Sequence, residues 1–156
     1  MRKPSATTFS HLPSTIRSAT APAVFKVMAV ALFSFGAAIH TLRLIIGWEN
    51  IVAHVLTPPV DVAFGAYLAG TAVAGLKSWG RYSGGEAGRA GYAFAMIMVI
   101  GSTLLHLSTA VTWSTAYLTV FPVFYSVVEI PMFLALVVVV SRLRFENGDS
   151  APVSSS

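Results

Sequence analysis

Four long runs of apolar residues, separated by short polar stretches, dominate the pattern of this 156-residue chain. They cover residues 23–47, 59–76, 90–112 and 118–140. Each run matches the roughly 17–25 residues that an α-helix needs to cross the hydrocarbon core of a bilayer. A helix is expected because backbone groups in lipid must find hydrogen-bond partners within the segment. The sequence therefore predicts an all-α membrane protein, a four-helix antiparallel transmembrane bundle within residues 23–144.

The composition agrees with a protein that is largely covered by lipid. Hydrophobic residues make up 55% of the chain and charged residues only 10%, whereas soluble domains carry about 25% charged residues. There is no cysteine, which excludes disulfides and thiolate metal sites. The formal net charge is +4, but the basic residues flank the apolar runs instead of forming one basic face. We therefore exclude nucleic acid as a partner and expect the lipid bilayer.

The distribution of Lys and Arg predicts the orientation in the membrane. Loops 48–58 and 113–117 contain neither residue, and every Lys and Arg except Arg43 lies toward the other side. The positive-inside rule then places both termini in the cytoplasm, in a bacterial inner membrane or plasma membrane. We expect disordered cytoplasmic segments at residues 1–22 and 145–156. For the first of these, an organellar transit peptide is the alternative.

The two predicted helical hairpins resemble each other weakly. Both contain a histidine, then a tryptophan at the outer interface, then a proline where the next helix begins. These residues are His40, Trp48 and Pro59 in the first hairpin, and His106, Trp113 and Pro122 in the second. Such a repeat would relate the hairpins by an axis along the membrane normal. Chance similarity between apolar sequences is the alternative.

Five ionisable residues lie within the apolar runs or near their ends: His40, Arg43, Asp61, His106 and Glu129. Because charge is costly in hydrocarbon, such residues face the bundle interior and find partners. A rise of about 1.5 Å per residue places both histidines roughly 10 Å beneath their tryptophans, at one level. Arg43 and Asp61 lie near the outer interface on adjacent helices, so we expect an ion pair. Arg43 is also a candidate anchor for an anionic ligand.

Glu129 is the most costly of these residues because it is expected near the midplane of the membrane. We expect His106, on the preceding helix, to be its charged partner. Tyr125 and Ser126 precede Glu129 by four and three residues, so they share its side of the helix and can hydrogen-bond to it. A neutral structural carboxyl group and a proton-carrying group are the two interpretations. Glu129, Arg43 and Asp61 are thus the candidates for ligand or proton handling.

The two histidines also raise the hypothesis of a bound cofactor. One imidazole on each of two helices at the same level can hold a haem b between them. Gly36 lies four residues before His40 and would leave room for a flat ring. A metal site formed by His40, His106 and Glu129, with Asp61, is the alternative, because imidazole and carboxylate bind zinc, copper or iron.

The sequence contains no catalytic motif, neither a phosphate-binding glycine loop nor a nucleophile elbow nor a zincin helix. An enzyme is therefore disfavoured, and three classes of function stay open. The first is a non-catalytic accessory subunit or small-ligand-binding membrane component, acting as a homo-oligomer or in a larger membrane complex. The second is a haem- or metal-binding electron-transfer or oxidoreductase subunit that uses His40 and His106. The third is a small proton-coupled transporter that uses Glu129. The first requires least beyond the sequence.

Overall fold

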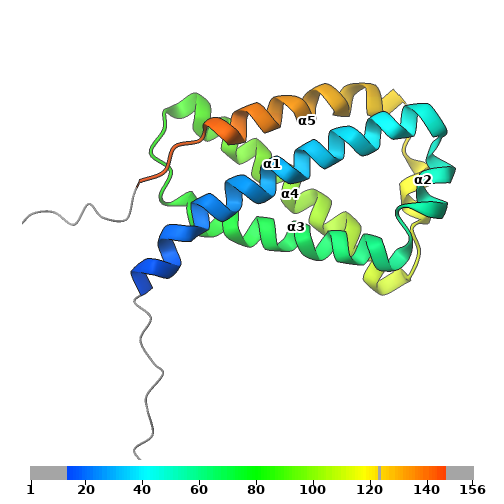
Figure 1. Ribbon diagram of the computed structural model, residues 1–156, viewed down its shortest axis with the longest axis horizontal. Coiled ribbons are helices and arrows are strands. Elements are labelled where there is room, and N and C mark those ends of the chain that lie inside the picture. The colour runs from blue at the N-terminus through cyan, green and yellow to red at the C-terminus, as the bar shows by residue number, and fades with distance from the viewer. Residues whose placement is uncertain (1–13, 123, 147–156) are drawn as a thin grey trace, which may run out of the picture.

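The computed structural model describes residues 14–122 and 124–146, with side chains described from residue 20 onward. The described part of the chain is helical, with one isolated β-bridge and no strand. Figure 1 shows the elements in chain order. They are α1 (Ser14–Ile46), α2 (Trp48–His54), α3 (Pro58–Trp79), α4 (Glu86–Thr112), the 3-10 helix η1 (Ala116–Val120) and α5 (Phe124–Arg142).

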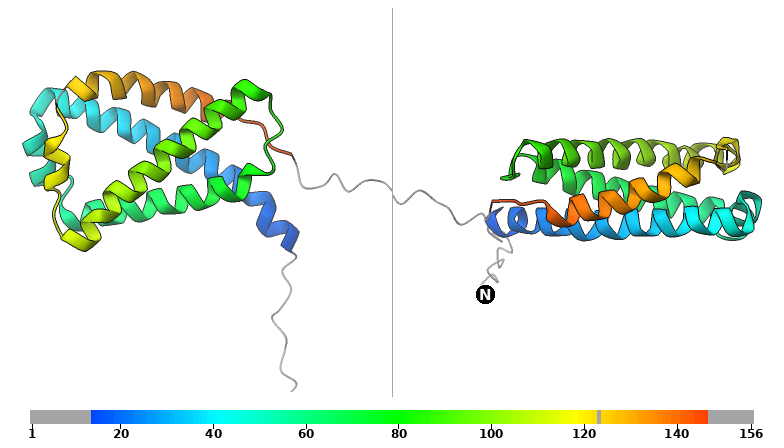
Figure 2. Two further views of the ribbon diagram at one scale, coloured as in Figure 1. Left: turned by 180° about the vertical axis from the view of Figure 1, so that it is seen from behind. Right: turned by 90° about the horizontal axis from the view of Figure 1, so that it is seen from above.

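Four of the described helices are long and apolar enough to cross a membrane: α1 from Thr20 onward, α3, α4 and α5. This agrees with an integral membrane protein with four spans. The long helices lie side by side, with α2 and η1 together at one end (Figures 1 and 2). Helix α1 packs closely on α5 and α3 packs closely on α4, whereas α4 and α5 touch much less. The bundle is therefore loosest between α4 and α5.

The first helix begins earlier than the sequence predicted. Residues 14–22 were expected in the disordered arm, but α1 already starts at Ser14 and contains Pro22. Residues 1–13 and 147–156, the remainder of the two expected disordered segments, lie outside the described residues. Phe145 and Glu146 do not belong to a free tail. Phe145 forms a bridge with Tyr82, and Glu146 N–H donates to the carbonyl of Arg81.

The last span begins six residues later than predicted. Residues 116–120 form η1, and α5 begins only at Phe124. The physical reason is Pro122, which disfavours the α conformation in the residue before it. Phe121 accordingly has the extended backbone angles φ −74° and ψ 121°. Residues 118–121 are thus a connecting segment, in which Leu118 is buried and Val120 is exposed.

The expected outer loop 48–58 contains a short helix instead. Gly47 has φ +83°, a left-handed conformation in which a side chain would be strained, and it turns the chain from α1 into α2. Trp48 then folds inward, and its indole Nε1 donates to the carbonyl of Leu118 in η1. A small apolar cluster forms around them, with Ile51 and Leu56 buried. This cluster ties α2 to η1 and covers one end of the bundle.

Candidate functional site

A cavity of about 400 Å³ lies inside the bundle, beneath the cover formed by α2 and η1. Most of its wall is apolar, with Phe64 and Phe133 among the larger side chains. The ionisable residues on this wall are His40, Arg43, His106 and Glu129. Four of the five predicted residues therefore meet at one cavity, and the fifth, Asp61, lies directly behind His106.

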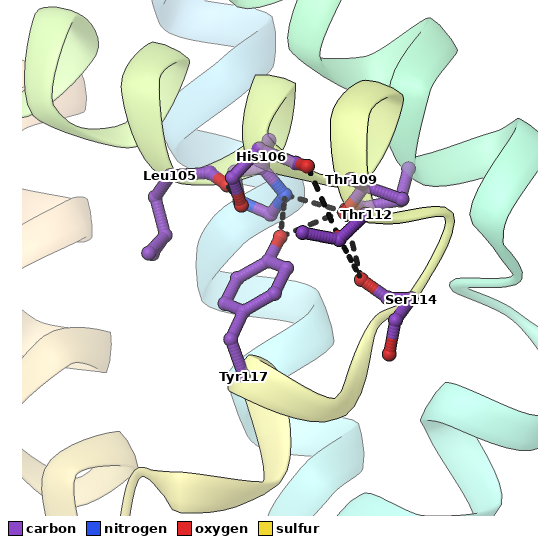
Figure 3. Close-up of polar contacts among 8 residues, drawn as sticks. Leu105, His106, Thr109, Thr112, Ser114 and Tyr117 are labelled. Atoms are coloured by element: carbon purple, nitrogen blue, oxygen red, sulfur yellow. Dashed lines mark hydrogen bonds and ion pairs between the residues drawn. The ribbon is translucent and has the colours of Figure 1, made fainter.

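The first polar cluster is centred on Asp61, whose side chain is completely buried. Its Oδ1 lies 2.6 Å from His106 Nδ1. Its Oδ2 accepts hydrogen bonds from Thr109 Oγ1 at 2.5 Å and from the Tyr117 hydroxyl at 2.8 Å. Figure 3 shows His106, Thr109 and Tyr117 converging from α4 and η1. Three donors thus replace the water that a buried carboxylate loses.

Local sequence explains how this cluster is positioned. Pro58 and Pro59 occupy the first turn of α3, where a missing backbone N–H is harmless, and Asp61 follows in the same turn. An acidic side chain near a helix N-terminus is stabilised by the helix dipole. His106 and Thr109 are three residues apart on α4, so both face α3.

Burial raises the pKa of the Tyr117 hydroxyl well above its ordinary value, and the hydrogen bond to Asp61 raises it further. Tyr117 therefore stays a donor.

The second polar cluster joins α1 to α5. His40 Nδ1 lies 3.0 Å from Ser126 Oγ and 2.8 Å from Glu129 Oε2. The contact with Glu129 is close, but it lacks hydrogen-bond geometry, and Oε2 is buried with no hydrogen-bond partner among the described residues. About a quarter of the Glu129 side chain is exposed.

Arg43 completes this cluster and is 1% exposed. Its Nη1 donates to Ser126 Oγ at 3.1 Å, and its Nη2 donates to the carbonyl of Phe121. The guanidinium also lies over the ring of Trp48, 4.5 Å from its centre, a cation–π arrangement. Its Nε has no hydrogen-bond partner in the part of the chain that the structure describes. Arg43 is attracted electrostatically by the carboxylate of Glu129.

Both ion pairs that the sequence predicted are wrong. Asp61 pairs with His106 and not with Arg43, which turns toward α5. Glu129 pairs with His40 and not with His106. Ser126 binds His40 and Arg43 instead of Glu129, and Tyr125 is 42% exposed. The reason is helix pairing, since α5 packs against α1 far more than against α4.

Two residues of the site were not predicted. The sequence identifies Tyr117 only as an interfacial aromatic residue, and Thr109 only as a hydroxyl bonded to the backbone. Thr109 carries a usable signal, because it follows His106 by three residues and so shares its helix face. Tyr117 carries none, because its approach to Asp61 depends on the path of η1.

The structure bears differently on the metal hypothesis and on the haem hypothesis. Within residues 14–122 and 124–146, no group of three or more His, Asp or Glu side chains could hold a metal ion, so the predicted metal site is not assembled. His54 is exposed on α2. The open face expected beside His40 is also absent, because a Cβ on Gly36 would lie 3.1 Å from the ring of Phe133. A haem could approach Gly36 only if Phe133 moved.

No protein-family model, curated protein or solved structure matches this chain. The function is therefore argued from the residues of the site and their chemistry, since a fold of four helices serves many unrelated functions.

Proposed function

We propose that this protein is a non-catalytic membrane component that binds a small lipid-soluble molecule in the cavity, as a homo-oligomer or within a larger membrane complex. The cavity volume of about 400 Å³ lies within the range of roughly 300–1,000 Å³ that is typical of small-molecule sites. Its wall has the usual composition of such a site, mostly apolar with a few polar groups that converge. His40, Arg43, His106 and Glu129 are those groups.

The observation that carries this proposal is the meeting of four ionisable side chains on the mostly apolar wall of one cavity. His40 and His106 each have one ring nitrogen, Nδ1, in contact with a carboxylate oxygen, whereas neither Nε2 has a hydrogen-bond partner among the described residues. The polar end of a ligand would supply that partner. Buried water would do so as well, and the experiment below separates the two.

The route into the cavity runs between α4 and α5. These helices touch little, and both contribute to the cavity wall. Gly101 of α4 lies on this wall, and a Cβ placed there would meet nothing within 4 Å. Ile97, one turn away, is 66% exposed. Such a lateral opening faces the hydrocarbon of the bilayer, so it admits molecules that are dissolved in lipid.

We expect Gly101→Leu to abolish most ligand retention without unfolding the protein. The leucine side chain would extend into the open space at the cavity wall, where no neighbour lies within 4 Å. The measurement is mass spectrometry of the small molecules that remain bound after purification in detergent. Gly80→Leu is the matched control, because Gly80 also has open space around it but lies at the end of α3, away from the cavity.

Wild-type protein and Gly80→Leu should retain the same molecule, and Gly101→Leu should retain several-fold less of it. If the wild type holds only bulk lipid in the same amount as Gly101→Leu, the cavity contains water and the proposal is wrong.

We further propose that consecutive spans run antiparallel and that both termini are cytoplasmic. The distribution of Lys and Arg supports this orientation. Single cysteines at Ser114 and Gly85 are readily interpreted because the native chain contains no cysteine and a Cβ at Gly85 would meet nothing within 4 Å. In oriented membranes, a membrane-impermeant maleimide should label the Ser114 variant from outside and the Gly85 variant only after the membrane is opened. Labelling of both variants from one side would contradict the topology.

A duplicated hairpin is also part of this proposal. A repeat about an axis along the membrane normal would exchange α1 with α4 and α3 with α5. It would therefore convert the contact of His40 on α1 with Glu129 on α5 into that of His106 on α4 with Asp61 on α3, which is the second contact observed. Under this exchange the close packing of α1 on α5 corresponds to that of α3 on α4, whereas the loose contact between α4 and α5 departs from the closer contact between α1 and α3.

The second candidate function is electron transfer through a haem b bound by both histidines. It is favoured by one observation, that each Nδ1 contacts a carboxylate, as the outer nitrogen of a metal-binding histidine commonly does. The side chain of Phe133 beside Gly36 opposes it. An absorption spectrum of protein produced with added haem tests whether the haem is bound. An intense Soret band that disappears in both His40→Phe and His106→Phe would establish the haem, and its absence would reject it.

A further inference from the structure

We propose that the molecule bound in this cavity is a lipid quinone, held through its two carbonyl oxygens by His40 and His106. The inference rests on the proposed function, because it names the class of ligand for the same cavity.

The contacts of each imidazole determine which ring nitrogen is left for a ligand. His106 Nδ1 lies 2.6 Å from Asp61 Oδ1, and His40 Nδ1 lies 2.8 Å from Glu129 Oε2. A nitrogen lone pair would be repelled by the Asp61 carboxylate, so His106 Nδ1 carries hydrogen. His40 Nδ1 also lies 3.0 Å from the Ser126 hydroxyl, which either donates to it or accepts from it, so this nitrogen is engaged as well. Each Nε2 is then left for other partners. Among the described residues neither Nε2 has a hydrogen-bond partner, and neither is among the fully buried unpaired atoms.

An imidazole held in this way can either accept or donate a hydrogen bond. When the ring is neutral, Nε2 has a lone pair and accepts from a hydroxyl group. When the ring is protonated, Nε2–H donates to a carbonyl oxygen, and the neighbouring carboxylate stabilises the positive charge. A ligand whose oxygens change between carbonyl and hydroxyl matches both forms. A quinone and its quinol are such a pair.

The two imidazoles approach the cavity from opposite helix pairs. His40 belongs to the α1–α5 pair and His106 to the α3–α4 pair, and both line the same cavity. A ligand that bridges them needs two polar oxygens separated by a short rigid body. The two carbonyl oxygens of a quinone lie at opposite ends of one flat ring, so a single quinone offers one oxygen to each helix pair.

The remaining wall suits an aromatic ring with an apolar tail. Phe64 lies edge-on to His106 with ring centres 4.8 Å apart, and Phe133 lies 5.5 Å from the His40 ring. Flat rings pack favourably against such aromatic side chains. The opening between α4 and α5 would let an isoprenoid tail extend into the bilayer. A quinone ring is also much smaller than a haem, so Phe133 need not move.

The local charge disfavours an anionic ligand such as a fatty acid. Glu129 and Asp61 place two carboxylates beside the histidines, and Arg43 is the only Lys or Arg side chain on the described cavity wall. Arg43 is already engaged by Ser126 and by the carbonyl of Phe121. A further carboxylate would therefore be repelled, whereas a neutral quinone adds no charge.

Binding of decylubiquinone to the full-length protein in detergent tests this inference. Calorimetric titration should give saturable binding of one molecule per cavity. Decylbenzene, which has the same tail and a ring without oxygens, should bind at least tenfold more weakly. His40→Phe and His106→Phe should each raise the Kd on the order of tenfold, the loss of about one good hydrogen bond. His40→Gln and His106→Gln, which retain hydrogen-bonding capacity, should raise it less.

His54→Phe is the matched control, because His54 is exposed on α2 and lies outside the cavity wall. Its Kd should equal that of the wild type. If the phenylalanine variants fail to fold, the comparison of decylubiquinone with decylbenzene on the wild type still tests whether the quinone oxygens contribute to binding. Equal affinity for the two compounds, or phenylalanine variants within twofold of the wild type, would overturn the inference. Retention of a different lipid that Gly101→Leu abolishes, without decylubiquinone binding, would leave the proposed function standing and reject the quinone.

Discussion

Replacing Asp61 by alanine is expected to lower the free energy of unfolding by about 3–5 kcal/mol, the usual loss when one partner of a buried charged pair is removed. The variant would leave His106 Nδ1, the Thr109 hydroxyl and the Tyr117 hydroxyl without their shared acceptor. Solvent does not readily replace it, because Asp61 is completely buried. Chemical denaturation in mild detergent, followed by circular dichroism, measures the change.

Glu86→Ala is the matched control for Asp61→Ala. Glu86 is also an acidic residue in the first turn of a long helix, but it is exposed. Its loss removes at most the interaction with the helix dipole, about 0.3–1 kcal/mol. Asp61→Asn should fall between the two, because the amide keeps one oxygen acceptor but turns an amino group toward the donors. If Asp61→Ala is no more destabilising than Glu86→Ala, the three hydrogen bonds are not formed in the membrane protein.

Arg43→Met is expected to destabilise the protein by a similar amount, about 3–5 kcal/mol. Methionine preserves much of the length of the side chain but loses the hydrogen bonds to Ser126 and Phe121 and the cation–π contact with Trp48. It also leaves Glu129 without its attracting cation. Arg142→Met is the matched control, because Arg142 is exposed in the last turn of α5.

The double variant Arg43→Met/Glu129→Gln separates charge from packing. Because the amide that replaces the Glu129 carboxylate carries no charge, the double variant should recover a measurable part of the stability lost in Arg43→Met, on the order of 1–2 kcal/mol. Strict additivity of the two single changes would show that Arg43 and Glu129 are not coupled.

Glu129→Gln alone also addresses the transporter hypothesis. In a structural role the variant folds and keeps its function. In proton transport it folds but loses pH-dependent uptake, while Asp61→Asn impairs uptake less.

The membrane spans were largely predictable because their signal is local. Helices α3 and α4 begin and end within four residues of the predicted runs, since transfer of an apolar run into lipid depends mainly on its own composition. The start of α5 was predicted wrongly although the sequence contained the signal. Residues 118–121 are apolar, but Pro122 prevents them from continuing into the helix. Hydropathy alone therefore misplaced a boundary that backbone sterics determined.

The sequence by itself also singled out four residues that meet at the cavity. His40, Arg43, His106 and Glu129 stand out because an ionisable side chain in an apolar run needs a partner inside the protein. All four lie on the wall of one cavity. That these side chains face the interior of the protein follows from the free energy of placing charge in lipid, which depends on residue type and depth and not on the details of the fold.

Only the tertiary structure decided which residues pair. The sequence favoured Arg43 with Asp61 and Glu129 with His106, whereas the contacts are Asp61 with His106 and Glu129 with His40. Either arrangement brings opposite charges together, so charge complementarity alone does not choose between them. The choice depends on which helices are neighbours and how each is rotated about its axis. Those properties arise from close packing between distant residues, such as Phe133 against Gly36 on α1 and Leu107 against Gly65 on α3.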